Sequence, residues 1–368
     1  MPVSRRGFLT AASVGVGAAV ASSVRTPIAG ANPLDTGSLG VAQDLLQAVP
    51  TGSGMIKPSG PLGHVGVTFP SADQMLGRIR FGFPDGSVGD WIPLQPHDSA
   101  PDSGSVPASE LVGAPEGAVS YEVDAPAGSQ ATAFDGGRGP ARNYSLGSTG
   151  LLNLPIIPRT AWGAGDPTGL QWGAPTFFGA QAITIHHTAV VPGPDRAASV
   201  RSIYNYHANT LGWGDIGYHL VIDPEGRIYQ GRGGAPVPVF QFPPLGGVTP
   251  PVVTGGHVGG FNNGNIGISL LGDFTWRGPT EAAIRSTIDC VRALAGVIGV
   301  HPNAGIVYRN PQGGATRPMP FVSGHRQWGG TSCPGDAFFS QMQFIRDHAA
   351  NGWIPSGVSS ATLPFGSS

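Results

Sequence analysis

Gln181-Ala182-Ile183-Thr184-Ile185-His186-His187 decides the fold of this chain, because it is an apolar strand that ends in two histidines. Successive residues of a strand point to opposite faces of its sheet. His186 and His187 therefore cannot both serve one metal from a regular strand. One of them is a ligand candidate, and the other is expected to pack or to support the ligand.

Helices and strands alternate around this strand from Leu154 onward. Residues 195–209 have one apolar face at helical spacing, and Thr280 caps a longer helix with its own apolar stripe. Further strands are expected at 218–222, 227–230, 266–271 and 321–325, and the first two of these form a hairpin. This order favours an α/β fold in which a mixed central β-sheet is flanked by helices.

The chain before Leu154 has a different pattern of apolar and polar residues. Between His64 and Tyr144, runs of about five residues alternate apolar and polar side chains and are separated by Pro, Gly and Asp turns. These runs predict a small β-sandwich-like domain, and they include residues 65–69, 77–81 and 119–123. His64 and His97 are isolated there, and we expect both to be packing or surface residues rather than ligands.

The first 31 residues carry an export signal. Ser4-Arg5-Arg6-Gly7-Phe8-Leu9 matches the twin-arginine pattern, and 18 uncharged residues rich in Ala, Gly and Ser follow from Gly7 to Val24. A membrane anchor is the alternative, but this stretch is weakly apolar, and Ala29-Gly30-Ala31 supplies a cleavage site. We expect cleavage after Ala31, no stable membrane anchor afterwards, and a protein that is secreted, periplasmic or associated with the cell wall.

The charge balance excludes two classes of partner. Acidic and basic residues number 22 and 20. The net charge is therefore close to zero, and no extended positive potential attracts nucleic acid or an anionic membrane. Gly and Pro number 59 and 36, and they are spread between apolar runs. This distribution indicates a folded protein with a hydrophobic core and many turns.

A second candidate cluster lies near the C-terminus. Ser323-Gly324-His325-Arg326 leads to Thr331-Ser332-Cys333. Cys333 follows His325 by eight positions, enough for a loop to return both side chains to one point. Two histidines and one thiolate would form a three-ligand zinc site with an open fourth position, which suits catalysis better than structure. The residues alone leave another interpretation open, in which the histidines are satisfied in the core and Cys333 is inert or bridged to Cys290.

Six blocks of sequence resemble, in order, the peptidoglycan recognition protein family, which is also the family of type 2 N-acetylmuramoyl-L-alanine amidases. The resemblance covers about residues 155–350. The blocks are Pro158–Ala164, the His-His-Thr strand, Gly212–His219, Gly256–Gly259 with Asn262, Gly267–Ser269, and the segment from Gly324 to Gly335. The β-rich segment before them is similar to accessory domains found ahead of such amidases in exported bacterial proteins.

The resemblance implies a metal site. The family's two metal histidines match His186 and His325, and its cysteine matches Cys333, which implies Zn²⁺ as the cofactor and a free thiolate rather than a bridge to Cys290. Members that keep this cysteine are typically amidases, whereas members that lost it bind cell wall without cutting it. Cys333 therefore favours an enzyme.

Three further positions acquire catalytic roles through the same resemblance. Tyr218 matches the active-site tyrosine, Thr331 matches a position near the substrate, and His257 matches a histidine on the cleft wall. His207 and His219 match family positions without an assigned chemical role, so we expect them to be structural.

Four positions are expected to bind substrate. Gly212 and Trp213 match a pair associated with stem peptides that carry meso-diaminopimelate, and Arg232 matches an arginine that would bind the extra carboxylate of that residue. Asn262 belongs to the block of sequence around His257, and we expect it to bind substrate together with Gly212, Trp213 and Arg232.

The resemblance implies an exported zinc-dependent N-acetylmuramoyl-L-alanine amidase, a hydrolase that cuts the amide between N-acetylmuramic acid and L-alanine in peptidoglycan. Its partners would be muropeptides, with other wall polymers bound through the β-rich domain. The alternative is a non-catalytic peptidoglycan-binding receptor. Two departures from the family concern substrate detail more than catalysis: Gln327 replaces the usual Asp, and a Pro-rich insertion occupies residues 234–254.

The predicted domains follow from these patterns. They are a twin-arginine signal peptide at 1–31, a linker at 32–59, the β-rich accessory domain at 60–150, the zinc amidase domain at 154–352 and a flexible tail at 353–368.

Overall fold

The computed structural model describes residues 48–52, 54–102, 104–135, 154–164, 175–233, 249–314 and 316–353. These residues belong to one compact unit. The predicted signal peptide, most of the linker, the tail beyond residue 353, most of the Pro-rich insertion and the predicted boundary near residue 150 lie outside the described residues. None of the helices in the described ranges is long and apolar enough to cross a membrane.

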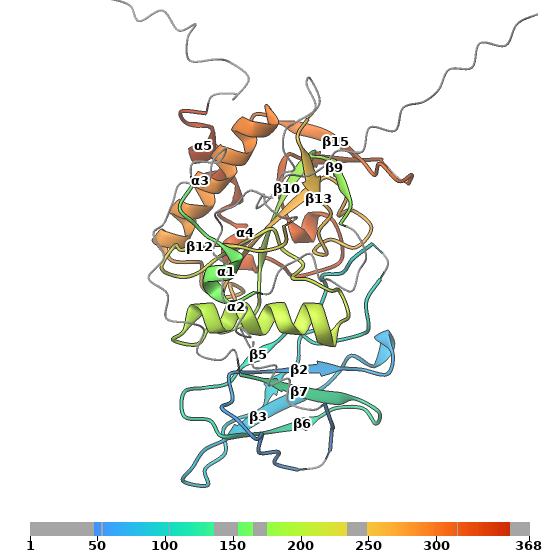
Figure 1. Ribbon diagram of the computed structural model, residues 1–368, viewed down its shortest axis with the longest axis vertical. Coiled ribbons are helices and arrows are strands. Elements are labelled where there is room, and N and C mark those ends of the chain that lie inside the picture. The colour runs from blue at the N-terminus through green and yellow to red at the C-terminus, as the bar shows by residue number, and fades with distance from the viewer. Residues whose placement is uncertain are drawn as a thin grey trace, which may run out of the picture. The chain divides into compact units, whose positions relative to one another are not determined.

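A six-stranded mixed sheet forms the centre of the region after Leu154 (Figure 1). Its strand order is β17-β10-β14-β11-β12-β8. In chain order, the bounds are β8 (Ile156–Ile157), β10 (Ala182–His187), β11 (Leu220–Ile222), β12 (Ile228–Gln230), β14 (Asn265–Leu270) and β17 (Val322–Gly324). All neighbours pair in parallel except β11 and β12, which form the predicted antiparallel hairpin. The predicted mixed sheet is confirmed.

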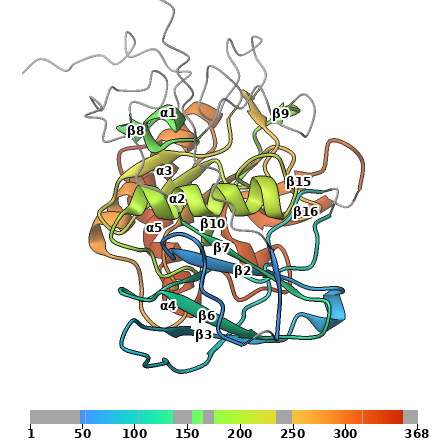
Figure 2. The same cartoon turned by 60° about the horizontal axis from the view of Figure 1, so that its bottom comes forward.

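Helices cover both faces of this sheet. On one face, α3 (Glu281–Ile298) and α5 (Met342–Ala350) pack against each other and against the isoleucines and leucines of the strands. On the other face, α1 (Arg159–Trp162) and α2 (Arg196–Asn205) share a second core with β11 and β12, and Figure 2 shows α2 running across the sheet. The predicted cap of α3 is present, since Thr280 Oγ1 accepts from the Ala283 amide at 3.1 Å.

Strand β10 is buried along its whole length because parallel strands flank it on both sides and helices lie above and below. Ile183 and Ile185 point into the core beneath α3. Thr184 points to the opposite face, where its hydroxyl donates to Asn265 Oδ1 at 2.8 Å. His186 lies two residues after Thr184 and therefore points to the same face of the sheet, away from the aliphatic core.

Two antiparallel sheets make up the region before Leu154, as the alternating pattern predicts. One has the order β1-β7-β2-β5 and the other β4-β3-β6. Their bounds are β1 (Val49–Pro50), β2 (His64–Thr68), β3 (Arg78–Gly82), β4 (Ile92–Pro93), β5 (Val112–Gly113), β6 (Ser120–Asp124) and β7 (Gln130–Phe134). Alternate residues of both sheets, such as Val65, Val67, Ile79 and Phe81, form one core, so the sheets pack face to face.

The remaining elements are short. They are β9 (Phe177–Gly179) paired with β13 (Pro251–Val253), the hairpin of β15 (Gly305–Arg309) and β16 (Thr316–Pro320), α4 (Asp336–Phe339), a π-helical turn at Tyr206–Thr210, and 3₁₀ turns at Ala72–Gln74 and His325–Gln327.

The β-rich region and the α/β region share a core. Phe134 and Leu111 belong to the same apolar cluster as the inner face of α2. The hydroxyl of Tyr206, directly after α2, donates to the Ser109 carbonyl at 2.6 Å. Gly66 in β2 leaves room for this ring, because a Cβ there would lie 2.5 Å from the Tyr206 ring. The two regions are therefore joined by close packing as well as by the chain.

His64 in β2 makes folding stability sensitive to acid. Its side chain is buried, neither ring nitrogen has a hydrogen-bond partner among the described residues, and burial lowers its pKa to about 4. The unfolded chain, with an ordinary histidine pKa, binds the proton first as pH falls below about 6.5. Stability from neutral His64 is therefore present above that pH and declines towards pH 4, with a loss of about 2 kcal/mol at pH 5.

His64→Leu should remove this loss. Urea unfolding of both proteins at pH 7.5 and pH 5 measures it, and the variant should lose about 2 kcal/mol less than the unmodified protein. Equal losses in the two proteins would show that His64 is not held neutral by the fold.

Candidate metal centre

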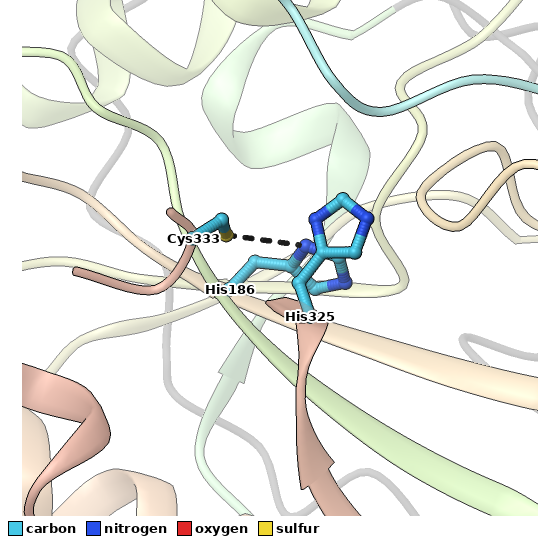
Figure 3. A group of neighbouring side chains, drawn as sticks. All are labelled: His186, His325 and Cys333. Atoms are coloured by element: carbon cyan, nitrogen blue, oxygen red, sulfur yellow. Dashed lines mark hydrogen bonds between the residues drawn. The ribbon is translucent and has the colours of Figure 1, made fainter. Parts of the chain in front are cut away.

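Three side chains from separate segments converge at one edge of the central sheet (Figure 3). His186 lies near the end of β10, His325 directly follows β17, and Cys333 lies in the loop beyond. One ligand atom from each residue lies within 4.8 Å of the other two, and all three side chains are buried. Because Ile185 pairs with Gly324 across parallel strands, the residues that follow them emerge side by side.

The loop from His325 to Cys333 is closed by its own hydrogen bonds. The Arg326 amide donates to the Cys333 carbonyl at 2.8 Å, and the Cys333 amide donates to Thr331 Oγ1 at 2.9 Å. The Arg326 guanidinium also donates to Asp336 Oδ1 at 2.6 Å. These bonds bring Cys333 back to His325, as the spacing of the two residues predicted.

A relay of hydrogen bonds fixes the orientation of His186. The carbonyl of Asn265 can only accept, so His257 Nε2, at 3.0 Å, must carry a proton and donate to it. Burial and neighbouring histidines hold the pKa of His257 well below its usual range, so its Nδ1 is bare and accepts from His186 Nε2 at 3.0 Å. Nδ1 of His186 then presents its lone pair towards Cys333. Such a partner behind a ligating histidine is the usual support of a metal site.

The donor set and its spacing fit zinc. Cys333 Sγ and His186 Nδ1 are 3.7 Å apart. A tetrahedral zinc ion with bonds of about 2.3 Å to sulfur and about 2.1 Å to nitrogen would hold two such atoms about 3.6 Å apart. Nδ1 of His325 is buried without a hydrogen-bond partner among the described residues, as expected of a ligand atom. Burial raises the pKa of the Cys333 thiol well above its usual value, so a cation would have to displace its proton.

His187 points to the opposite face, which confirms the prediction from strand alternation. Its Nδ1 accepts from the Phe274 amide at 3.2 Å, and the two rings lie 6.2 Å apart between centroids. Its backbone amide approaches Cys333 Sγ at 3.4 Å. His187 thus supports the cysteine through its backbone, while its ring lies outside the three-ligand cluster.

Tyr218 and Thr331, both predicted to be catalytic, lie beside the three ligands. The ring centroid of Tyr218 is 5.3 Å from that of His186. Burial raises the pKa of the Tyr218 hydroxyl well above its usual value, so it keeps its proton and can donate. Thr331 stands next to Cys333 through the amide contact described above.

His257 and Asn262 lie elsewhere than predicted. We expected His257 on the cleft wall, but its ring is fully buried behind His186, where Gly267 makes room because a Cβ there would lie 2.7 Å from the ring. Asn262 was expected to bind substrate, but its Oδ1 accepts from the amides of His257 and Val258 at 2.7 and 2.9 Å. Both residues therefore support His186. His257 is hydrogen-bonded to its ring, and Asn262 holds the backbone of His257.

Of the three residues predicted to recognise the stem peptide, Trp213 and Arg232 are buried and Gly212 is exposed. Trp213 is 2% exposed and Arg232 is 4% exposed. The Arg232 guanidinium donates to the carbonyls of Ile216 at 2.8 Å and Asp215 at 3.0 Å. Gly212 adopts a φ of 71°, a left-handed conformation that favours glycine. In this structure Arg232 holds the loop between Trp213 and Ile216.

His97 is not isolated, in contrast to the prediction. His207 Nδ1 accepts from the Gly217 amide at 3.1 Å, so its Nε2 carries the proton and donates to His97 Nε2 at 3.0 Å. His97 Nδ1 in turn lies 3.0 Å from Glu110 Oε1. His207 and His219 are both buried and hydrogen-bonded to backbone, in keeping with their predicted structural roles.

Asp98, Ser99 and Asp102 also lie against the candidate site, although no pattern in the sequence predicted them. Asp98 Oδ1 is 3.5 Å from His325 Nδ1, and Ser99 Oγ is 3.5 Å from the Tyr218 hydroxyl. They precede the strand of His186 by 80 positions or more, and no spacing rule links them to it. The one local feature that could have drawn attention to this segment is the run of polar residues His97-Asp98-Ser99 between Pro96 and Pro101.

The chain is similar to known proteins over this region. Residues 178–336 match the family described as N-acetylmuramoyl-L-alanine amidase. A human N-acetylmuramoyl-L-alanine amidase is 34% identical over 203 residues, which are 52% of this chain and 29% of that protein. Peptidoglycan-recognition protein LB of Drosophila melanogaster is 30% identical over 220 residues, which are 58% of this chain and 78% of that protein.

Among solved structures, the wild-type Drosophila PGRP-LB matches with 26% identity over 51% of this chain and 92% of that chain, at a TM-score of 0.37. The chain thus spans most of the fly protein but less than a third of the length of the human one.

A graded series of variants tests the ligand assignment. Cys333→Ala or His186→Ala should lower zinc affinity by well over about 100-fold, because each removes one of three ligands. His257→Ala removes only the support of His186 and should cost about 10- to 100-fold. His187→Ala is the control and should leave zinc content near that of the unmodified protein. Competition with a chromophoric chelator measures each affinity, and a zinc loss in His187→Ala as large as in His186→Ala would reverse the assignment.

Proposed function

Since the chain belongs to the family of N-acetylmuramoyl-L-alanine amidases and peptidoglycan-recognition proteins, we propose that it is a zinc-dependent amidase. Its substrate would be peptidoglycan, and the bond cut would be the amide between N-acetylmuramic acid and L-alanine. The observation that carries this proposal is the buried cluster of His186, His325 and Cys333. Two nitrogens and one sulfur leave one tetrahedral position open, which is the composition of catalytic rather than structural zinc sites.

The residues beside the cluster support hydrolysis. A zinc ion held there would supply Lewis-acid polarisation of the scissile carbonyl and an acidified water. The Tyr218 hydroxyl, which keeps its proton, can donate to the carbonyl oxygen as negative charge develops on it. Thr331 Oγ1 lies next to Cys333 and can hold a group of the substrate by a hydrogen bond. His257 and Asn265 keep His186 in the tautomer that ligation needs.

A non-catalytic receptor is the competing function, since peptidoglycan-recognition proteins are among the relatives. A receptor has no need of the thiolate, whereas the fold here closes the loop from His325 to Cys333 and brings Cys333 to the histidines. We therefore favour the enzyme.

Purified muropeptides distinguish the two functions. Incubation with the zinc-loaded protein should give separate sugar and peptide products by mass spectrometry, with no cut inside the peptide. Cys333→Ala should abolish the products, and added chelator should do the same. Binding without any product from the zinc-loaded protein would favour the receptor.

We also propose a preference for stems with meso-diaminopimelate over lysine. Arg232 is buried and its guanidinium donates to the carbonyls of Ile216 and Asp215, so it would act by presenting the loop from Trp213 to Ile216 to the substrate. A preference worth about 1.5–3 kcal/mol corresponds to roughly ten- to a hundredfold in kcat/KM.

Arg232→Ala should remove most of this preference. The ratio of kcat/KM on the two muropeptides measures it, and Arg285→Ala, at an exposed position on α3, is the control that should keep the ratio. Equal rates of the unmodified enzyme on both muropeptides would contradict the preference.

A further inference from the structure

The ring of Tyr218 lies between two histidine rings. Its centroid is 5.3 Å from that of the candidate ligand His186 and 5.6 Å from that of His207. Its hydroxyl lies 3.5 Å from Ser99 Oγ of the β-rich region. The position of Tyr218 therefore depends on what holds His207 as well as on what holds the metal centre.

Hydrogen bonds fix the backbone on both sides of Tyr218. The Gly217 amide donates to His207 Nδ1 at 3.1 Å, and the Gly217 carbonyl accepts from the Gly256 amide at 3.0 Å. The Tyr218 carbonyl accepts from the Arg232 amide at 2.7 Å. His207 is the one partner in this set that contributes a side chain, so the orientation of its ring bears directly on where Tyr218 lies.

The β-rich region sets the orientation of the His207 ring. His207 Nδ1 accepts from Gly217, so the proton of this ring lies on Nε2 and is donated to His97 Nε2 at 3.0 Å. His97 then carries its own proton on Nδ1, which faces Glu110 Oε1 at 3.0 Å. We call Glu110, His97 and His207 the outer relay.

The outer relay allows one arrangement of protons, because the Gly217 amide can only donate and the Glu110 carboxylate can only accept. Burial opposes a second proton on His97 and Glu110 favours one, which leaves the pKa of His97 above its usual value. That proton would lie on Nε2, opposite the proton of His207, so the contact with His207 opposes it. His97, Asp98 and Glu110 also lie close enough to meet one cation, but His97 Nδ1 would then lose the only proton of its ring. The geometry is therefore that of a hydrogen-bonded relay rather than of a second metal site.

Aromatic packing holds His97 in the outer relay. Its side chain is 2% exposed, and its ring stacks on His207 at 5.0 Å and 25° between planes. The centroid of Trp213 lies 5.3 Å away on the same ring, and Trp213 Nε1 donates to Ser105 Oγ at 2.9 Å. Such contacts fix the plane of a ring as well as its position. The β-rich region thus meets the residues around Tyr218 through a fixed, buried contact.

We propose that His97 and Glu110 are positioning residues for Tyr218 and that the β-rich region thereby completes the active site. The effect on catalysis rests on the proposed amidase function, whereas the placement of the Gly217–Tyr218 backbone does not. Without His97, the buried Nε2–H of His207 would have no acceptor among the described residues, and the ring would turn to find one. A displacement of about 1 Å at a group that acts on the transition state can cost about a hundredfold in rate.

His97→Phe keeps a stacked ring but removes both hydrogen bonds. We expect kcat on soluble muropeptides to fall about tenfold with KM within about twofold, because the Tyr218 hydroxyl acts on charge that develops in the transition state. Zinc affinity should equal that of the unmodified protein. His64→Phe is the control, since it makes the same change at a buried histidine of the same region that has no hydrogen-bond partner among the described residues. It should match the unmodified protein in kcat, KM and zinc affinity.

A Tyr218→Phe background separates positioning from a general loss of structure. This change alone should lower kcat about a hundredfold, as expected when one donor to the developing charge is lost. His97→Phe added to it should cost less than about twofold more, because no hydroxyl is left to misplace. A further tenfold loss in this background would overturn the proposal, since a merely structural role costs the same in both backgrounds.

Two variants of Glu110 test the other end of the outer relay. Glu110→Gln keeps an oxygen that can accept from His97 Nδ1 and should hold kcat within about threefold of the unmodified protein. Glu110→Leu removes the acceptor and should lower kcat about tenfold, as His97→Phe does. Equal losses in the two variants would contradict a role as hydrogen-bond acceptor.

Amide hydrogen exchange gives a readout that needs no cleavage. The peptide that contains Gly217 should exchange about tenfold faster in His97→Phe, while peptides from β3 and α3 exchange as in the unmodified protein. Unchanged exchange at Gly217 would overturn the positioning role, and an equal rise throughout the chain would assign His97 to the stability of the fold instead. If the unmodified protein cleaves no muropeptide while exchange at Gly217 rises as stated, the amidase function fails and the positioning role stands.

Discussion

The parallel pairing of β10 with β14 on one side and β17 on the other is the constraint on which the rest of the molecule depends. It buries β10 on both faces, so each polar side chain of the strand needs a partner inside the protein. Thr184 finds Asn265, and His186 finds His257, whose own partner is the carbonyl of Asn265. The same pairing brings the carboxyl ends of β10 and β17 to one edge, where ligands gather in open α/β sheets. The strand pairing therefore also sets the positions of His186 and His325 in the candidate metal centre.

Hydrogen bonds between neutral groups hold the histidines of the centre in place. Burial lowers the pKa values of His186, His257 and His219, so their hydrogen bonds run between uncharged rings and carbonyls. Ordered neutral dipoles orient His186 without the desolvation cost of buried charges. The thiol of Cys333, whose pKa burial raises, follows the same rule.

The sequence predicted those features that depend on local periodicity. Alternation along β10 separated His186 from His187, and the spacing from His325 to Cys333 predicted a loop that closes on itself. The positions of His257 and Asp98 could not be predicted in this way. The first depends on Gly267, whose missing side chain leaves room for a ring from another loop. The second depends on how two regions pack, and no local pattern encodes that.

The packing of Tyr206 against Gly66, with its hydroxyl on the Ser109 carbonyl, has a consequence for how such chains diversify. A domain joined only by a linker can be exchanged for another without changes elsewhere. Here the surface beyond α2 is shaped to one particular strand, and a Cβ at position 66 would already collide with it. Any replacement of the β-rich region would have to be accompanied by changes on the helical side. In chains that carry both regions, substitutions on the two sides of this contact are therefore expected to occur together.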